Sequence, residues 1–97
     1  MGKKEEYSTG EQKVISDASN LQRFILEYEK QFQKLTGREV EVLTMIAKGM
    51  ENPAIAQKLN ITRTTVQNHR AGIRGKLPIE SQADYIKYAL AFGLVSF

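Results

Sequence analysis

The chain has 97 residues, 41% of them hydrophobic, which suits one compact domain with a tail rather than two separate cores. It contains no cysteine, so disulfide frameworks, thiolate chemistry and zinc sites built from sulfur are excluded, and a reducing cytoplasm fits this composition. No apolar run approaches the roughly 18 to 20 residues that cross a bilayer, and no apolar signal core follows the first lysines, so we expect a cytoplasmic protein without a membrane partner.

The net charge of +3 is small, but it is unevenly distributed along the chain. Residues 1–35 are neutral in sum, whereas residues 36–97 carry the whole excess. Between Glu51 and Glu80 there is no acidic residue, and this window contains Lys58, Arg63, Arg70, Arg74 and Lys76. Such a stretch suits a surface that faces phosphates, because neutralising phosphates releases counterions and favours DNA binding. It is equally typical of a solvated charged face, so charge alone leaves both interpretations open.

The N-terminal third is predicted to consist of a tail and a helix. Residues 1–18 are polar and mix both charges, which predicts a flexible tail. From Ser19 or Asn20, either of which suits a helix N-cap, apolar side chains recur at helical spacing to about Lys34. The stripe consists of Leu21, Phe24, Ile25, Tyr28 and Phe32. Residues 19–34 therefore form an amphipathic helix or linker, which must cover the following domain, a second copy of the chain or a missing upstream domain.

Two shorter helices are expected next. Thr36, with Glu39 three residues later, has the capping-box spacing, and Gly49 suits the left-handed end of the helix. Asn52 as a cap, followed by Pro53 in the first turn, predicts the start of the next helix. The predicted inward residues of the two helices are Val40, Leu43, Ile46, Ala47, Ile55, Ala56 and Leu59.

The last two helices follow a tight turn. Asn60 tolerates a positive φ, Ile61 would fill the core at the turn, and Thr62 is placed to cap a helix that runs to about Leu77. Pro78 closes that helix. A final helix is expected from about Ser81 to Phe92, ended by Gly93, with Tyr85, Ile86, Ala89, Leu90 and Phe92 on its apolar side. A short helix, a three-residue turn and a longer helix are the plan of the helix-turn-helix, whose second helix enters the major groove of DNA.

The helix from Arg63 to Leu77 is predicted to read DNA. If Val66, Ile73 and Leu77 face the core, the helical period turns Gln67 and Asn68 outward, and both amides can bond bidentately to adenine. The predicted base-reading residues are Gln67, Asn68, Ala71 and Thr64. The predicted phosphate contacts are Thr62, Arg63, Thr65, Arg70, Arg74 and Lys76, although Arg70 and Arg74 are also compatible with ordinary solvated charges. Ala71, Gly72 and Gly75 would let another backbone, from protein or DNA, approach closely.

Several segments at fixed spacing carry a family resemblance: Leu35 to Leu43, Ile46 to Gly49, Asn52 to Thr62, Thr65 to His69, Ile73, Lys76 with Leu77, and Gly93 with Leu94. Together they resemble the LuxR-type, or GerE-like, DNA-binding domain of bacterial transcriptional regulators. The resemblance implies an all-α fold: residues 35–97 form a four-helix helix-turn-helix domain, with a three-helical core and a C-terminal dimerisation helix, after the amphipathic N-terminal helix. It also implies base contacts at the positions of Gln67, Asn68 and Ala71, and phosphate contacts near Thr65 and Lys76.

The chain departs from the family pattern at four positions. Gln67 stands where many members carry lysine, and Gln82 where arginine is common. Glu51 replaces a small hydroxyl residue, and Tyr85 occupies a position that is usually small. We therefore expect a different DNA site from that of many members, and altered pairing through the last helix.

The sequence thus predicts sequence-specific binding of double-stranded DNA in the major groove and regulation of transcription, with no cofactor, metal or small-molecule ligand. A homodimer is expected through Tyr85, Tyr88, Ala89 and Phe92, because the last helix is rich in aromatic residues that look exposed. Two alternatives stay open: a promoter-reading domain like that of sigma factors, and an interaction module without DNA binding whose patch would include Phe97. An enzyme is not expected, because His69 is the only histidine and no carboxylate pair, glycine-rich loop or metal cluster accompanies it.

Overall fold

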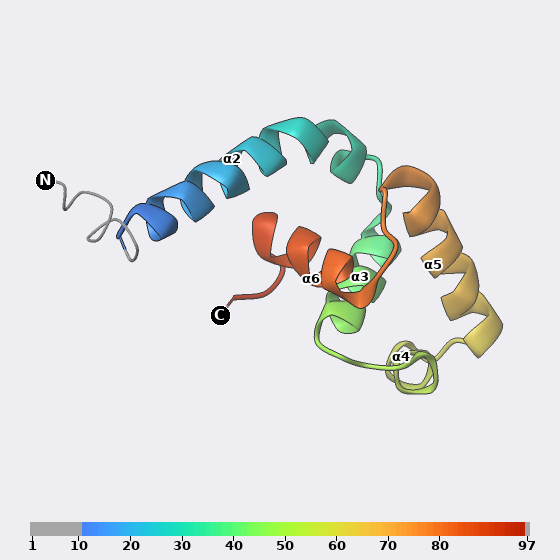
Figure 1. The fold of residues 1–97 in the computed structure, drawn as a ribbon. Helices are drawn as coiled ribbons and strands as arrows, with labels where there is room; N and C mark the ends of the chain where they lie inside the picture. The colour runs from blue at the N-terminus through green and yellow to red at the C-terminus, as the bar shows by residue number, and fades with distance from the viewer. Residues whose placement is uncertain (1–10, 97) are drawn as a thin grey trace, which may run out of the picture.

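The computed structural model describes residues 11–96 and is all-helical over that range (Figure 1). Its helices are α2 (Glu11–Gln33), α3 (Gly37–Ala47), α4 (Asn52–Leu59), α5 (Arg63–Lys76) and α6 (Gln82–Ala91). The predicted fold class, four helices behind an N-terminal helix, is therefore confirmed. None of these helices is long and apolar enough to cross a membrane.

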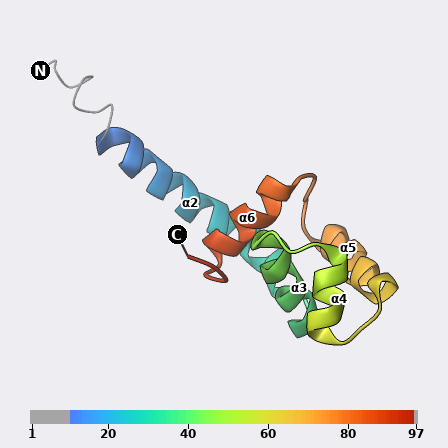
Figure 2. The same ribbon diagram turned by 90° about the horizontal axis from the view of Figure 1, so that it is seen from below.

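Helix α2 begins earlier than predicted, at Glu11 rather than at Ser19 or Asn20. The helix therefore includes residues 11–18 of the predicted tail, while residues 1–10 of that tail lie outside the described residues. The physical reason is that extending an existing helix costs little, and Glu11, Gln12 and Lys13 are good helix formers that need no burial. Helix α2 consequently projects well beyond the other helices, which gather at one end of the molecule (Figures 1 and 2).

The helix boundaries depend on local chemistry that the sequence made visible. The Thr36 side chain accepts a hydrogen bond from the Glu39 N–H at 3.0 Å, and Glu39 Oε1 accepts one from the Thr36 N–H at 2.9 Å, so the predicted capping box is confirmed. Gly49 has a φ of 90° and Asn60 a φ of 57°, the left-handed conformations expected at these two helix ends. Helix α4 differs, because its N-cap is Glu51, which makes no side-chain capping bond.

Helix α3 lies at the centre, in contact with α4, α5 and α6 (Figure 2). A helix with neighbours on three sides buries more than one stripe, which explains why Val42, not predicted as a core residue, is fully buried. The predicted core residues Val40 and Ala47 are only half-buried. Each fully buried aliphatic side chain contributes about 1.5–3 kcal/mol to folding. The buried hydrophobic core consists of Leu35, Val42, Leu43, Ile46, Ile55, Ala56, Val66, Ile73, Leu77, Ile79, Tyr85, Tyr88 and Ala89.

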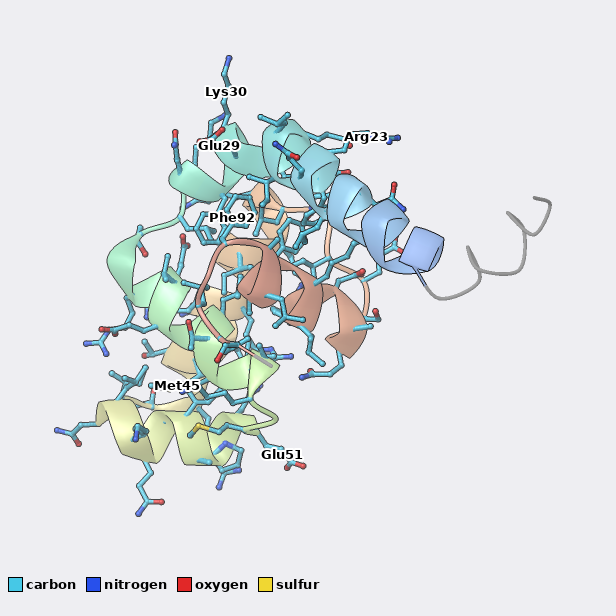
Figure 3. The ribbon with its side chains drawn as sticks, turned by 90° about the vertical axis from the view of Figure 1, so that its left-hand side faces the viewer. Arg23, Glu29, Lys30, Met45, Glu51 and Phe92 are labelled. Carbon is cyan, nitrogen blue, oxygen red and sulfur yellow. The ribbon has the colours of Figure 1, made fainter. Side chains whose placement is uncertain are left out.

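Helix α2 covers helix α6 of the same chain, which is one of the three partners that the sequence left open. The Phe24 ring lies 4.9 Å from the Tyr88 ring, and Phe32 stacks on Phe92 at 4.1 Å. Figure 3 shows Phe92 beneath α2, whereas Arg23 and Lys30 point away from the outer side of α2. We call Phe24, Tyr28, Phe32, Tyr88 and Phe92 the aromatic cluster.

The aromatic cluster contains two residues of the predicted dimerisation face, Tyr88 and Phe92. Tyr85, Tyr88 and Ala89 are 3%, 2% and 0% exposed, and Phe92 is half-buried, so the expectation of exposed aromatic residues on the last helix was wrong. The apolar period of α6 was identified correctly, but a stripe does not reveal which element covers it. In this structure one part of the apolar stripe of α6 packs in the core, and α2 covers the other part.

Candidate nucleic-acid interface

Helix α5 buries its aliphatic side and exposes its amide-bearing side. Val66 and Ile73 are 0% exposed, whereas the Gln67 and Asn68 side chains lie in solvent. Thr64 and Ala71 are exposed on the same side as these amides. The orientation of the helix is therefore the one that the helical period predicts, and it makes the four proposed base-reading residues available to a ligand.

The turn before α5 fixes where this helix begins. Asn60 adopts the left-handed conformation, and the Ile61 N–H donates to the Ala56 carbonyl at 2.9 Å. Thr62 Oγ1 then accepts from the Thr65 N–H at 3.0 Å, so its predicted capping role is confirmed. The hydroxyls of Thr62 and Thr65 also lie 2.9 Å apart. Both side chains are therefore engaged within the first turn, and the cap already uses the N–H of Thr65.

The predicted phosphate-contacting cations fall into two groups. Arg63 and Arg74 are exposed, and no acidic side chain of residues 20–96 pairs with either of them. Arg70 is instead anchored: its Nη1 donates to Asn52 Oδ1 at 3.2 Å, and its guanidinium lies 5.3 Å from the centre of the Tyr85 ring. Asn52 thus ties α4 to α5 rather than capping its own helix as the sequence suggested, which leaves the start of α4 without a side-chain cap.

Lys76 is held inside the fold by Glu39. Its Nζ lies 2.7 Å from Glu39 Oε1, and the Glu39 side chain is 9% exposed. Burial alone raises the pKa of Glu39, but the hydrogen bonds from Lys76 and Thr36, with the charges of Lys76 and His69, outweigh it and hold the pKa below its ordinary value. The positive charge of Lys76 is thus largely compensated before any phosphate arrives.

Gly72 is part of the same buried arrangement. A Cβ at this position would collide with the Glu39 carboxylate, whereas a Cβ at Gly75 would meet nothing within 4 Å. Gly72 therefore permits a close approach within the protein and not to DNA. Sequence reasoning missed this arrangement because Glu39 and Lys76 are 37 residues apart, and only the capping box hinted that Glu39 had a structural role.

The chain is similar in sequence to a family of known proteins. The sequence model of the family described as "Bacterial regulatory proteins, luxR family" matches residues 33–89. The chain is 41% identical over 66 residues to the oxygen regulatory protein NreC of Staphylococcus aureus, and equally so to that of Staphylococcus haemolyticus. The alignment covers 68% of this chain but only 30% of each of those proteins. The similarity therefore concerns one part of the relatives.

Proposed function

Because the chain belongs to the luxR family of bacterial regulatory proteins, we propose that it binds double-stranded DNA sequence-specifically and so regulates transcription. The observation that supports this most is the exposed face of α5, where Gln67 and Asn68 stand clear of the core with Arg74 beside them. A helix of this length fits the major groove, and the two amides match the donor and acceptor pattern of adenine. A protein that acts on a bacterial chromosome works in the cytoplasm.

In the proposed complex, Gln67 and Asn68 contact base edges, while Thr64 and Ala71 lie against the groove. Arg63 and Arg74 reach the phosphates directly, because neither is paired within the part of the chain that the structure describes. The remaining predicted phosphate contacts act less directly, since each is already bonded within the chain: these are Thr62, Thr65, Arg70 and Lys76.

The proposed assembly on DNA is a homodimer with one recognition helix in each of two neighbouring major grooves. The contact cannot use Tyr88 unless α2 moves, and Ala89 is fully buried in the core, so the exposed side of α6 is the better surface. On that side Ile86 is 38% exposed and Lys87 lies in solvent. The alternative of an interaction module without DNA binding loses support, because Tyr85 and Tyr88 are buried. Phe97, the other residue named for its patch, lies outside the described residues.

A binding experiment tests the proposal directly. The chain is titrated into fluorescent duplex DNA of random sequence over a series of salt concentrations, and the bound sequences are then selected from the pool. We expect affinity to fall steeply with salt, since phosphates are neutralised, and the selected sequences to share a short motif. Arg74→Gln should weaken binding to all sequences and flatten the salt dependence. The absence of binding at low salt would refute the proposal.

A further inference from the structure

A small hollow of about 210 Å³ lies between the second half of α5 and the start of α6. Arg74 belongs both to this hollow and to the exposed region of α5, so the hollow opens beside the proposed DNA-reading face. The residues that line it are Arg70, Arg74, Ile79, Glu80, Ser81, Gln82 and Tyr85.

Tyr85 lines this hollow and carries an unusual buried group. Its side chain is 3% exposed, and its hydroxyl is a buried polar group without a hydrogen-bond partner among the described residues. Buried hydroxyls are nearly always paired, because an unpaired one loses its hydrogen bonds to water and gains none in return. Phenylalanine would fill the same space without that cost. The hydroxyl of Tyr85 therefore suggests a partner that is absent from the isolated chain.

The charges around the hollow indicate what kind of partner this is. Arg70 lies over the Tyr85 ring, and Arg74 is exposed and unpaired within residues 20–96. The Asp84 carboxylate lies at the edge of this hollow, because its Oδ2 accepts from the N–H groups of Glu80 at 2.8 Å and Ser81 at 3.1 Å, and both of these residues line it. The two guanidinium groups thus share the hollow with the exposed carboxylate of Glu80, whereas Asp84 is already bonded at the start of α6.

A larger hollow of about 610 Å³ at the start of α4 gives a useful contrast. It also includes Arg70, but the carboxylate of Glu51 lines it, and Figure 3 shows this side chain reaching outward. The Arg70 guanidinium is tied to Asn52 on that side, and no buried polar atom of that hollow lacks a partner among the described residues. Of these two hollows, only the smaller one is lined both by two arginines and by a residue, Tyr85, whose buried hydroxyl has no hydrogen-bond partner among the described residues.

We propose that the hollow at the start of α6 binds a phosphate group, with Arg70 and Arg74 neutralising its charge and the Tyr85 hydroxyl donating to one of its oxygens. The source of the phosphate is either the DNA backbone beside the reading helix, in which case the inference rests on the proposed function, or a free phosphate ion. Because the hydroxyl is buried and the Arg70 guanidinium is bonded to Asn52, side chains around the Tyr85 ring must shift, and Arg70 must turn from Asn52, before a phosphate oxygen reaches the hydroxyl.

The test compares Tyr85→Phe with the matched variant Tyr88→Phe. Both changes remove one hydroxyl from a buried tyrosine of α6, but Tyr88 packs in the aromatic cluster outside the hollow. The full chain and both variants are titrated with inorganic phosphate at constant ionic strength, followed by arginine side-chain NMR signals, and separately with duplex DNA. Thermal unfolding checks the fold. We expect Tyr85→Phe to unfold at the same or a higher temperature, because its hydroxyl has no partner in the isolated chain.

Phosphate binding to Tyr85→Phe should be roughly ten-fold weaker, as expected for a lost hydrogen bond to a charged group, while Tyr88→Phe should bind like the parent chain. A loss seen only with DNA assigns the hollow to a backbone phosphate, and a loss seen only with the free ion assigns it to that ion. Equal binding by Tyr85→Phe and the parent in both titrations would refute the inference, with the hydroxyl then bonded to an internal water only. If DNA binds normally in that case, the proposed function stands; if the parent binds no DNA, the proposed function fails independently.

Discussion

Gln67 is the side chain on which the choice of DNA sequence depends most in the proposed complex. Its amide is exposed near the middle of α5, next to Ala71, whose small side chain does not hold the helix away from the bases. We expect Gln67→Ala to reduce discrimination between preferred and altered sites by about 1–3 kcal/mol, the range for a bidentate amide contact to adenine. Selection of bound oligonucleotides by the parent and the variant measures this change.

The control for that prediction is Gln57→Ala. Gln57 is also an exposed glutamine of the helix-turn-helix, but it lies on α4 rather than on the reading helix. Its removal should leave the selected motif unchanged. A motif that survives Gln67→Ala as well would show that α5 is oriented differently on DNA.

Gly72 and Gly75 provide a second comparison at the scale of single residues. An alanine at Gly72 must push the Glu39 carboxylate aside, which weakens its bonds to Thr36 and Lys76, whereas an alanine at Gly75 has open space. Both substitutions gain about 1 kcal/mol of helix propensity. Because a buried group that loses its partner costs about 1–3 kcal/mol, Gly72→Ala should be less stable than Gly75→Ala by roughly that amount.

Urea unfolding of the two glycine variants, followed by helical circular dichroism, gives the difference directly because the propensity gain cancels between them. Equal stabilities would mean that Glu39 moves without cost, and that its ion pair with Lys76 contributes nothing to the fold.

At the scale of helices, the contact between α2 and α6 depends on Tyr88 remaining uncharged. Burial, followed by the charges of Tyr28, Asp84 and Glu27, raises the pKa of Tyr88 from 10.0 to about 12. Between these pH values the unfolded chain has already released the proton while the folded chain still holds it. Stability is therefore complete below pH 10 and falls as the pH rises, by about 1 kcal/mol at pH 11 and up to about 3 kcal/mol above pH 12.

Urea unfolding of the parent chain at pH 9 and pH 11 measures this loss, and Tyr88→Phe is the variant that should reduce it. Phenylalanine keeps the ring that packs on Phe24 but has no proton to lose. If the parent and Tyr88→Phe lost the same amount of stability, the alkaline effect would arise from another group.

The elements also show where sequence reasoning succeeds. Thr36, Asn60 and Thr62 were placed correctly because capping and positive φ are decided by neighbours within a few residues along the chain. The side of α5 that faces solvent was predicted for a similar reason, since helical periodicity is local. In contrast, the start of α2 was misplaced, because residues 11–18 are largely polar in sequence and gave no clear helix signal.

The candidate site was less predictable wherever two distant segments meet. The bond between Arg70 and Asn52, the pairing of Glu39 with Lys76 and the cover of α6 by α2 all join residues that no short pattern connects. Each of these contacts differs from what the sequence predicted. Arg70 is anchored to Asn52, the charge of Lys76 is largely compensated by Glu39, and Tyr88 is buried rather than exposed. The exposure of Gln67 and Asn68 could be predicted from the local helical period. The hydrogen-bond and ion-pair partners of Arg70 and Lys76 could be identified only from the folded structure.

For the whole molecule, the proposed homodimer has consequences for the geometry of its DNA site. Two recognition helices that enter neighbouring major grooves require half-sites about one helical turn, or roughly 10 base pairs, apart. Adding about five base pairs between the half-sites rotates one of them to the opposite side of the duplex, where a rigid pair of proteins cannot reach both. We expect that insertion to abolish cooperative binding and a full-turn insertion to restore part of it.

Gel-shift titration on the three duplexes distinguishes one bound copy from two. Because α2 already covers Tyr88, the pairing surface left on α6 is small, so we also expect the chain to sediment as a monomer without DNA. Independent binding to both half-sites at every spacing would mean that the copies do not touch. In that event each chain would bind DNA as a monomer, and the contacts of its own α5 alone would determine its affinity.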